Sequence, residues 1–155
     1  MLISDKELMI FLGIAKKATY ANQLAPKAKS LRPASEDYHY EQDGLIYHDT
    51  YFGSRDFIGE EIVYKDNQPI WGMNYCGYII ESQISTREAY KILRPALMAD
   101  CEDILPVRGP KEFMLKDSLY LNKISGEINR FFGEENIYLN NKLVYYGRYH
   151  GGRIV

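Results

Sequence analysis

The chain begins with apolar residues at helical spacing behind a capping box. Ser4 and Glu7 form the box, because each side chain can satisfy the other residue's backbone amide. The inward apolar positions that follow are Leu8, Phe11, Leu12 and Ala15. This spacing predicts a helix over residues 5–18. Met9, Ile10 and Ile14 widen its apolar face, which favours burial on two sides, against a sheet and against another subunit.

A second capping box, Ser85 and Glu88, opens another helical pattern. Its inward positions are Ala89, Ile92, Leu93, Ala96 and Leu97. Pro95 lies inside this pattern and removes one backbone donor, so we expect it to kink or divide the helix. Residues 20–36, which precede the strands, have no apolar period and predict a long surface loop.

Turn dipeptides separate the strand-like runs of the chain. The three that suit a two-residue type I′ turn are Asp43-Gly44, Asp66-Asn67 and Asn140-Asn141. Further strands are expected at residues 120–124 and 127–132, joined near Ser125-Gly126. Strands joined by tight turns are antiparallel. We therefore predict an α+β fold, an antiparallel meandering sheet of about six to eight hairpin-linked strands with two main helices packed on it. We expect a single domain over residues 1–155, with no separate helix-turn-helix and no internal repeat.

Composition places the chain among folded, cytoplasmic proteins. It is 46% apolar and 26% charged, with a mean hydropathy of -0.36. No run approaches the roughly 18 apolar residues of a membrane span, and the first residues lack the order of a signal peptide. Cys76 and Cys101 fit free thiols in a reducing compartment. The net charge of -2 gives no field for a polyanion, so neither nucleic acid nor membrane is an expected partner.

Polar residues inside the aromatic run from Tyr47 to Ile80 indicate a cavity. If Asp66-Asn67 forms the turn, Glu61 lies opposite Gly72 on one face of the hairpin with Asn74. A carboxylate and an amide flanked by glycines leave room for a small ligand. The alternative is that Glu61 pairs with an arginine or a tyrosine hydroxyl and only closes the sheet.

The leading prediction is thus a small-ligand-binding, sensor-like domain without a cofactor. Its candidate residues are Glu61 and Asn74 as polar anchors, Trp71, Tyr75, Tyr51 and Tyr78 as walls, and Arg55 and Arg108 as anion contacts. Aromatic faces beside arginine suit a nucleotide-like molecule, and other small anions fit equally.

Two alternatives belong to other functional classes. The first is a small hydrolase, with Glu61 as general base or with a zinc site at His39 and His48, which the Asp43-Gly44 turn places opposite each other with Glu41 on the same face. An edge hairpin with such residues is also commonly just solvated. No GxSxG, GxGxxG or P-loop motif is present, so no enzyme class is favoured. The second alternative is a homodimeric interaction module that associates through the first helix.

Several segments together resemble a known family. They are RPASEDYHYEQDG, YFGSRDFIGEEIVY, PIWGMNYCGYI, LRPAL, PVRGP and YHGGRI. The set resembles an uncharacterised bacterial domain family found alone or C-terminal to an Xre-type helix-turn-helix in predicted transcriptional regulators, over residues 8–154. The resemblance implies an accessory or sensing domain. This chain departs from the regulators because only one helix is expected before its sheet, too little for a DNA reader, so we expect a stand-alone binding protein.

Overall fold

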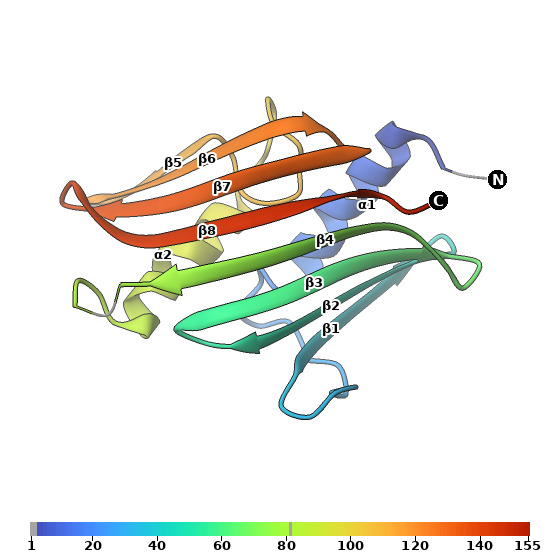
Figure 1. Ribbon diagram of the computed structural model, residues 1–155, viewed down its shortest axis with the longest axis horizontal. Coiled ribbons are helices and arrows are strands. Elements are labelled where there is room, and N and C mark those ends of the chain that lie inside the picture. The colour runs from blue at the N-terminus through green and yellow to red at the C-terminus, as the bar shows by residue number, and fades with distance from the viewer. Residues whose placement is uncertain (1–2, 81) are drawn as a thin grey trace.

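The computed structural model describes residues 3–80 and 82–155, and in that part of the chain a helix and four strands are followed by a second helix and four more strands (Figure 1). The elements are α1 (Asp5–Ala18), β1 (Glu36–Gln42), β2 (Leu45–Gly53), β3 (Asp56–Lys65), β4 (Gln68–Ile79), α2 (Thr86–Met98), β5 (Glu112–Leu115), β6 (Ser118–Glu127), β7 (Arg130–Leu139) and β8 (Lys142–Arg153). Both capping boxes form, at Ser4 and at Ser85. The predicted α+β fold is confirmed.

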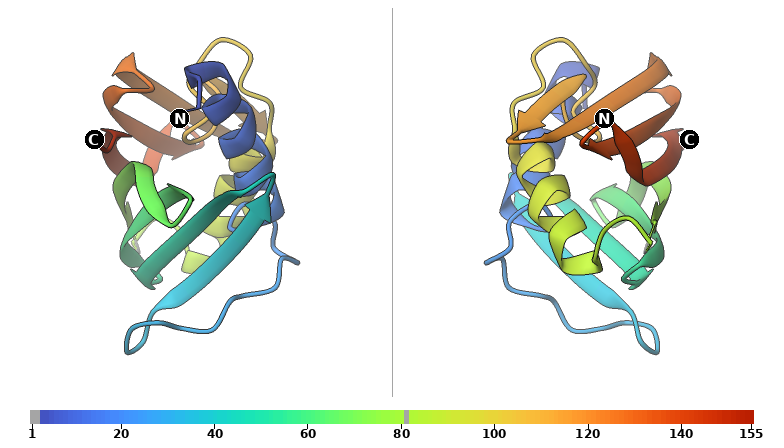
Figure 2. Two further views of the ribbon diagram at one scale, coloured as in Figure 1. Left: turned by 90° about the vertical axis from the view of Figure 1, so that its right-hand side faces the viewer. Right: turned by 90° about the vertical axis from the view of Figure 1, so that its left-hand side faces the viewer.

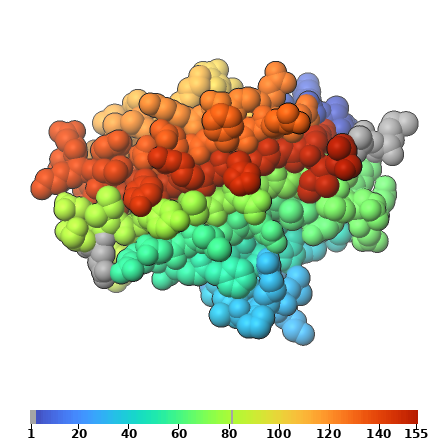
Figure 3. Space-filling model, in the orientation of Figure 1, coloured from blue at the N-terminus to red at the C-terminus, as the bar shows by residue number. Residues whose placement is uncertain are grey.

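The eight strands form one open antiparallel sheet in the order β1-β2-β3-β4-β8-β7-β6-β5. Both helices lie on the same face of this sheet, which curves around them (Figure 2). Neither of the two described helices covers the opposite face, which we call the uncovered face; it is turned toward the viewer in Figure 3. Neither described helix has the length and apolar content needed to span a bilayer. The fold therefore offers two places for a site, the interior beneath the helices and the uncovered face.

The three predicted hairpin turns are confirmed by their backbone angles. Both residues of Asp43-Gly44, Asp66-Asn67 and Asn140-Asn141 have positive φ, as a type I′ turn requires. Three other details differ from the sequence expectations or go beyond them. Strand β5 and its Lys116 turn were not foreseen, because Lys-Asp carries no turn signature. The β6–β7 turn follows Glu127 rather than Ser125-Gly126. Pro95 does not divide α2, which runs as one helix from Thr86 to Met98 with buried residues on either side of the proline.

The chain contains two similar halves, which the sequence analysis missed. Each half is a helix followed by a four-stranded meander, and β3 and β7 have identical alternations of buried and exposed residues. Each hairpin carries a bulge at the same place, before Tyr64 and before Tyr138. Strands β4 and β8 pair antiparallel with Tyr75 opposite Tyr149, its own counterpart. An approximate two-fold axis therefore passes between these tyrosines and relates one half to the other.

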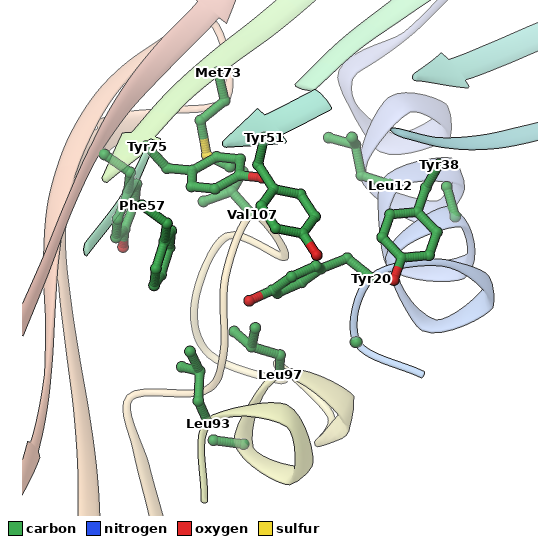
Figure 4. Close-up of a cluster of buried hydrophobic side chains, with 14 of the residues drawn as sticks. Leu12, Tyr20, Tyr38, Tyr51, Phe57, Met73, Tyr75, Leu93, Leu97 and Val107 are labelled. Atoms are coloured by element: carbon green, nitrogen blue, oxygen red, sulfur yellow. The ribbon is translucent and has the colours of Figure 1, made fainter. Parts of the chain in front are cut away.

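Aromatic side chains fill the space between the sheet and the helices. Figure 4 shows tyrosines from several elements, among them Tyr20, Tyr38, Tyr51 and Tyr75, gathered above Leu97 of α2. The rings of Tyr38 and Tyr51 stack at 6.5 Å, and Tyr20 meets each of them edge-on. Most of the tyrosines therefore pack in the core. Their buried hydroxyls need hydrogen-bond partners in the interior.

Candidate functional site

The predicted register across β3 and β4 is wrong by one residue. Val63 lies opposite Trp71 and Glu61 opposite Met73, because the bulge beside Tyr64 leaves one residue of β4 without a partner. Successive side chains of a strand point to opposite faces, so this slip changes which residues share a face. Glu61 is buried on the helix side, while Asn74 lies exposed on the uncovered face. The two predicted anchors therefore do not share a cavity.

The predicted aromatic walls are divided between the same two faces. Trp71, Tyr75 and Tyr51 are buried on the helix side, where the indole of Trp71 donates a hydrogen bond to the Ile128 carbonyl at 3.1 Å. Tyr78 lies on the uncovered face and stacks on Tyr146, with ring centroids 5.1 Å apart. These four rings therefore cannot enclose one ligand.

The two predicted anion contacts are also far from equivalent. Arg55 is exposed in the β2–β3 turn and pairs with Asp56 at 3.3 Å. Arg108 is buried on the helix side and forms a bidentate ion pair with Glu135, in which two guanidinium nitrogens lie 2.5 and 3.1 Å from the two carboxylate oxygens. Because these guanidinium donors already bind Glu135, Arg108 is not available to an anionic ligand in this arrangement.

The predicted facing of His39 and His48 on the edge hairpin is confirmed, with their rings 6.1 Å apart. The Nε2 atom of His48 forms a hydrogen bond with the carboxylate of Asp37 at 2.9 Å, so it is not directed at a ligand shared with His39. The Thr50 hydroxyl donates to the same carboxylate at 2.6 Å. Burial would raise the pKa of Asp37, but these hydrogen bonds and one from Ser35 outweigh it and lower the pKa to about 2. Within residues 3–80 and 82–155, no three His, Cys, Asp or Glu side chains, Glu41 included, are grouped as metal ligands.

The second half has a saturated polar core. Besides Arg108, Glu135 accepts hydrogen bonds from the hydroxyls of Tyr120 and Tyr145, each at 2.7 Å. Burial would raise the pKa of Glu135, but the charge of Arg108 and these hydrogen bonds outweigh it and hold the pKa below its usual value. Asn122 accepts from Tyr149 and donates to a backbone carbonyl. Every buried group of this cluster thus has a partner, as a structural role requires.

The first half has a corresponding core that is not saturated. Glu61, the counterpart of Glu135, is bound by Lys16 of α1 at 2.5 Å. Asp49, the counterpart of Asn122, accepts from Tyr75 at 2.7 Å, but its other oxygen and the hydroxyls of Tyr20 and Tyr47 lack partners among the described residues. The free space beside Glu61 is only about 10 Å³, room for one water molecule at most. The geometry leaves no space for a substrate there, so it gives the hydrolase alternative no support.

Each half places one arginine in the loop that enters its first strand, and the two arginines go to opposite faces. Arg32 and Arg108 both begin an R-x-x-x-E pattern that ends at the first residue of β1 or β5. Arg108 turns into the interior. Arg32 reaches the uncovered face, where it pairs with Glu60 at 2.9 Å and its guanidinium lies 5.3 Å from the centre of the Phe52 ring. Lys16 supplies the interior charge that Arg32 does not.

The displaced arginine borders a depression in the uncovered face. Its volume is about 430 Å³, within the range of small-molecule sites. The residues that give it chemical character are Arg32, Phe52, Ile58, Glu60, Asn74 and His150. Asn74 and His150 lie directly opposite each other across the β4–β8 pair. The depression thus joins an apolar floor to a guanidinium, a carboxylate, an amide and an imidazole, which can bind an anionic ligand with an apolar body.

Sequence reasoning missed the residues that distinguish the two halves. Lys16, Arg32 and Asp49 contact residues far away in the sequence, so no local pattern marks them. One signal was available: the FxGEE motif that begins at Phe57 recurs at Phe131, each time followed by a tyrosine and a type I′ turn. Aligning those two motifs would have exposed the repeat and the non-equivalent partners of its glutamates.

One comparison with known proteins decides the family. The family model described as "Domain of unknown function (DUF5680)" matches residues 49–154. The chain belongs to the DUF5680 family. The DUF5680 match begins inside β2 and includes Glu61, Glu135 and the β4–β8 pair, while α1 and the Arg32 loop precede it. The expectation of an uncharacterised domain is confirmed. No curated protein and no solved structure matches the chain.

Proposed function

We propose that this protein binds a small anionic molecule in the depression of the uncovered face. The observation that carries the proposal is the position of Arg32. Its counterpart Arg108 serves the interior, whereas Arg32 lies over Phe52 at the border of the depression. An ion pair as exposed as Arg32–Glu60, with side chains 49% and 42% accessible, adds little to stability. A recognition role accounts for its placement better than a structural one.

The chemistry of the lining defines the ligand class. The guanidinium of Arg32 can bind a carboxylate or phosphate with two parallel hydrogen bonds. Phe52 and Ile58 offer apolar contact for the body of the ligand, and Asn74 and His150 offer hydrogen bonds on the opposite side. A nucleotide-like molecule or an aromatic carboxylate meets all of these requirements. A sensing role agrees with the resemblance to domains that accompany helix-turn-helix regulators.

The test is a thermal-shift screen of nucleotides and aromatic carboxylates, followed by calorimetry of the hits. Arg32→Ala and Asn74→Ala are expected to abolish binding without loss of fold. Arg148→Ala is the matched control, because Arg148 pairs with Glu134 at 3.1 Å on the same face, with a similar exposure, outside the depression. Hits that bind Arg32→Ala as well as the wild type, or a screen without any hit, would refute the proposal.

A second candidate function, self-association through α1, is favoured by one observation. Ile10 and Ile14 are 55% and 41% exposed on successive turns of α1. They border two hollows, of about 320 and 240 Å³. A ridge flanked by grooves suits packing against the same helix of a second copy.

Sedimentation velocity over a range of concentrations tests this candidate. The wild type is expected to dimerise, and Ile10→Glu with Ile14→Glu is expected to keep it monomeric. Leu24→Glu, at an exposed loop position, is the control that should leave the dimer intact. A wild type that stays monomeric at every concentration would exclude self-association.

A further inference from the structure

Helix α2 carries a cluster of basic side chains. Arg87, Lys91 and Arg94 recur at helical spacing and, with Gln23 and Tyr90, line a hollow of about 260 Å³. Among the described residues, none that lines this hollow is acidic. Within the described part of the chain none of the three cations forms a close ion pair, although the charges of Glu88 and Lys91 attract each other along the helix. Like charges at this spacing repel one another, so the folded protein bears a cost that a bound anion would remove.

Arg94 is held in place by aromatic rings rather than by an acid. Its guanidinium carbon lies 5.7 Å from the centre of the Tyr20 ring and 5.6 Å from that of Tyr90. The Tyr90 hydroxyl is itself fixed by donating to the Ser54 carbonyl at 2.8 Å. The Nε atom of Arg94 is buried and has no hydrogen-bond partner among the described residues. A buried donor without an acceptor is costly, so within the described residues the two aromatic rings are the contacts that fix the Arg94 guanidinium beside the hollow.

We propose that this hollow binds the phosphate groups of a small phosphorylated molecule. Three cations call for an anion of more than one charge, and arginine donors match the spacing of phosphate oxygens. The volume suits a small molecule, and the net charge of -2 argues against a nucleic-acid surface. The hollow lies on α2, whereas the depression lies on the uncovered face, so this site does not depend on the proposed function.

Calorimetric titration with inorganic pyrophosphate, at constant ionic strength, tests the site. The wild type is expected to bind, and Arg87→Ala with Lys91→Ala is expected to weaken binding at least about tenfold, because two charge-assisted contacts are lost. Both residues are exposed, so the fold should persist, which circular dichroism checks. Lys111→Ala with Lys142→Ala removes the same charge from exposed positions elsewhere and should bind like the wild type. Arg32→Ala should also bind pyrophosphate normally.

Three results would overturn the proposal. The first is a wild type that does not bind pyrophosphate. The second is an equal loss of affinity in the two double variants, which would mean that binding follows net charge alone. The third is tighter binding of a DNA duplex than of pyrophosphate, abolished by Arg87→Ala with Lys91→Ala, which would make the hollow part of a nucleic-acid surface.

Discussion

Replacing Asp49 by asparagine is expected to stabilise the protein at neutral and alkaline pH. Burial, and then the negative charge of Glu61 opposite, raise the pKa of Asp49 to about 8, although Tyr75 donates a hydrogen bond to it. The second half places Asn122 at the corresponding position, where it accepts the same hydrogen bond from Tyr149. In the second half, therefore, an amide that does not titrate accepts the hydrogen bond that Asp49 accepts in the first half.

The size of the effect follows from proton linkage. An aspartate in the unfolded chain titrates near pH 3.9, so between about pH 4 and pH 8 only the folded state keeps the proton. Stability is thus full at low pH and falls as the pH rises toward 8. Each tenfold change in proton affinity is worth about 1.4 kcal/mol, so the fall is on the order of 5 kcal/mol.

The variant also introduces a cost of its own. The new amide nitrogen would carry two N–H groups in place of the single O–H of protonated Asp49, at an oxygen that has no partner among the described residues, and the additional unmet buried donor costs about 1–3 kcal/mol. Asp49→Asn should therefore be more stable than the wild type by about 2–4 kcal/mol at pH 8 and less stable at pH 4.5. This change of sign between the two pH values distinguishes the mechanism from simple repacking.

Urea unfolding followed by circular dichroism at pH 4.5, 6 and 8 provides the assay. The matched control is Asn122→Asp, which puts a carboxylate beside Glu135 and should lose stability as the pH rises. A wild-type stability that stays constant from pH 5 to pH 8 would refute the reasoning. So would a difference between Asp49→Asn and the wild type that does not change with pH.

Three further predictions concern stability. Arg108→Met leaves a buried carboxylate unpaired and should cost about 3–5 kcal/mol in urea unfolding, whereas Arg148→Ala, from an exposed pair, should cost less than about 1 kcal/mol. Gly59→Ala should lower the melting temperature through a loss of about 1–3 kcal/mol, because the new Cβ would lie 2.4 Å from the Tyr75 ring. Because the pKa of Asp37 is lowered to about 2, the stabilisation by its charge is present above about pH 4 and is lost as the pH falls toward 2. Asp37→Asn should therefore reduce the loss of stability in acid, which acid unfolding followed by Trp71 fluorescence measures.

The elements that could be predicted from the sequence are those with local causes. A serine and a glutamate within one turn fix where each helix begins, so the residues 5–18 helix was found to the residue. Dipeptides such as Asn140-Asn141 fix a hairpin because few other residues accept positive φ twice in succession. The strand bulge beside Tyr64 has no such local signature. The single unpaired residue there shifts the register by one, so that Glu61 and Asn74 lie on opposite faces and do not form the predicted site.

The candidate site depends on contacts between distant parts of the chain, which is why most of it could not be predicted. Arg32 lies in a loop with no periodic pattern, and nothing in that loop says which face of the sheet it will reach. Asn74 was expected to line a cavity with Glu61, whereas it borders the depression on the opposite face of the sheet. The ligand class of the prediction, a small anion beside aromatic rings, stays a prediction that the depression supports with different residues.

The pairing of β4 with β8 has a consequence for any chain that contains only one half. A protein ending after Ile80 would keep α1 and a four-stranded meander but would expose the whole edge of β4. An uncovered strand of that length recruits another strand. Because Tyr75 pairs with its own counterpart in the intact sheet, two such fragments could join edge to edge in the same register and restore an eight-stranded sheet with true two-fold symmetry. The full chain is, in this sense, a dimer linked into one polypeptide, and the covalent link is what allows Arg32 and Arg108 to take different roles.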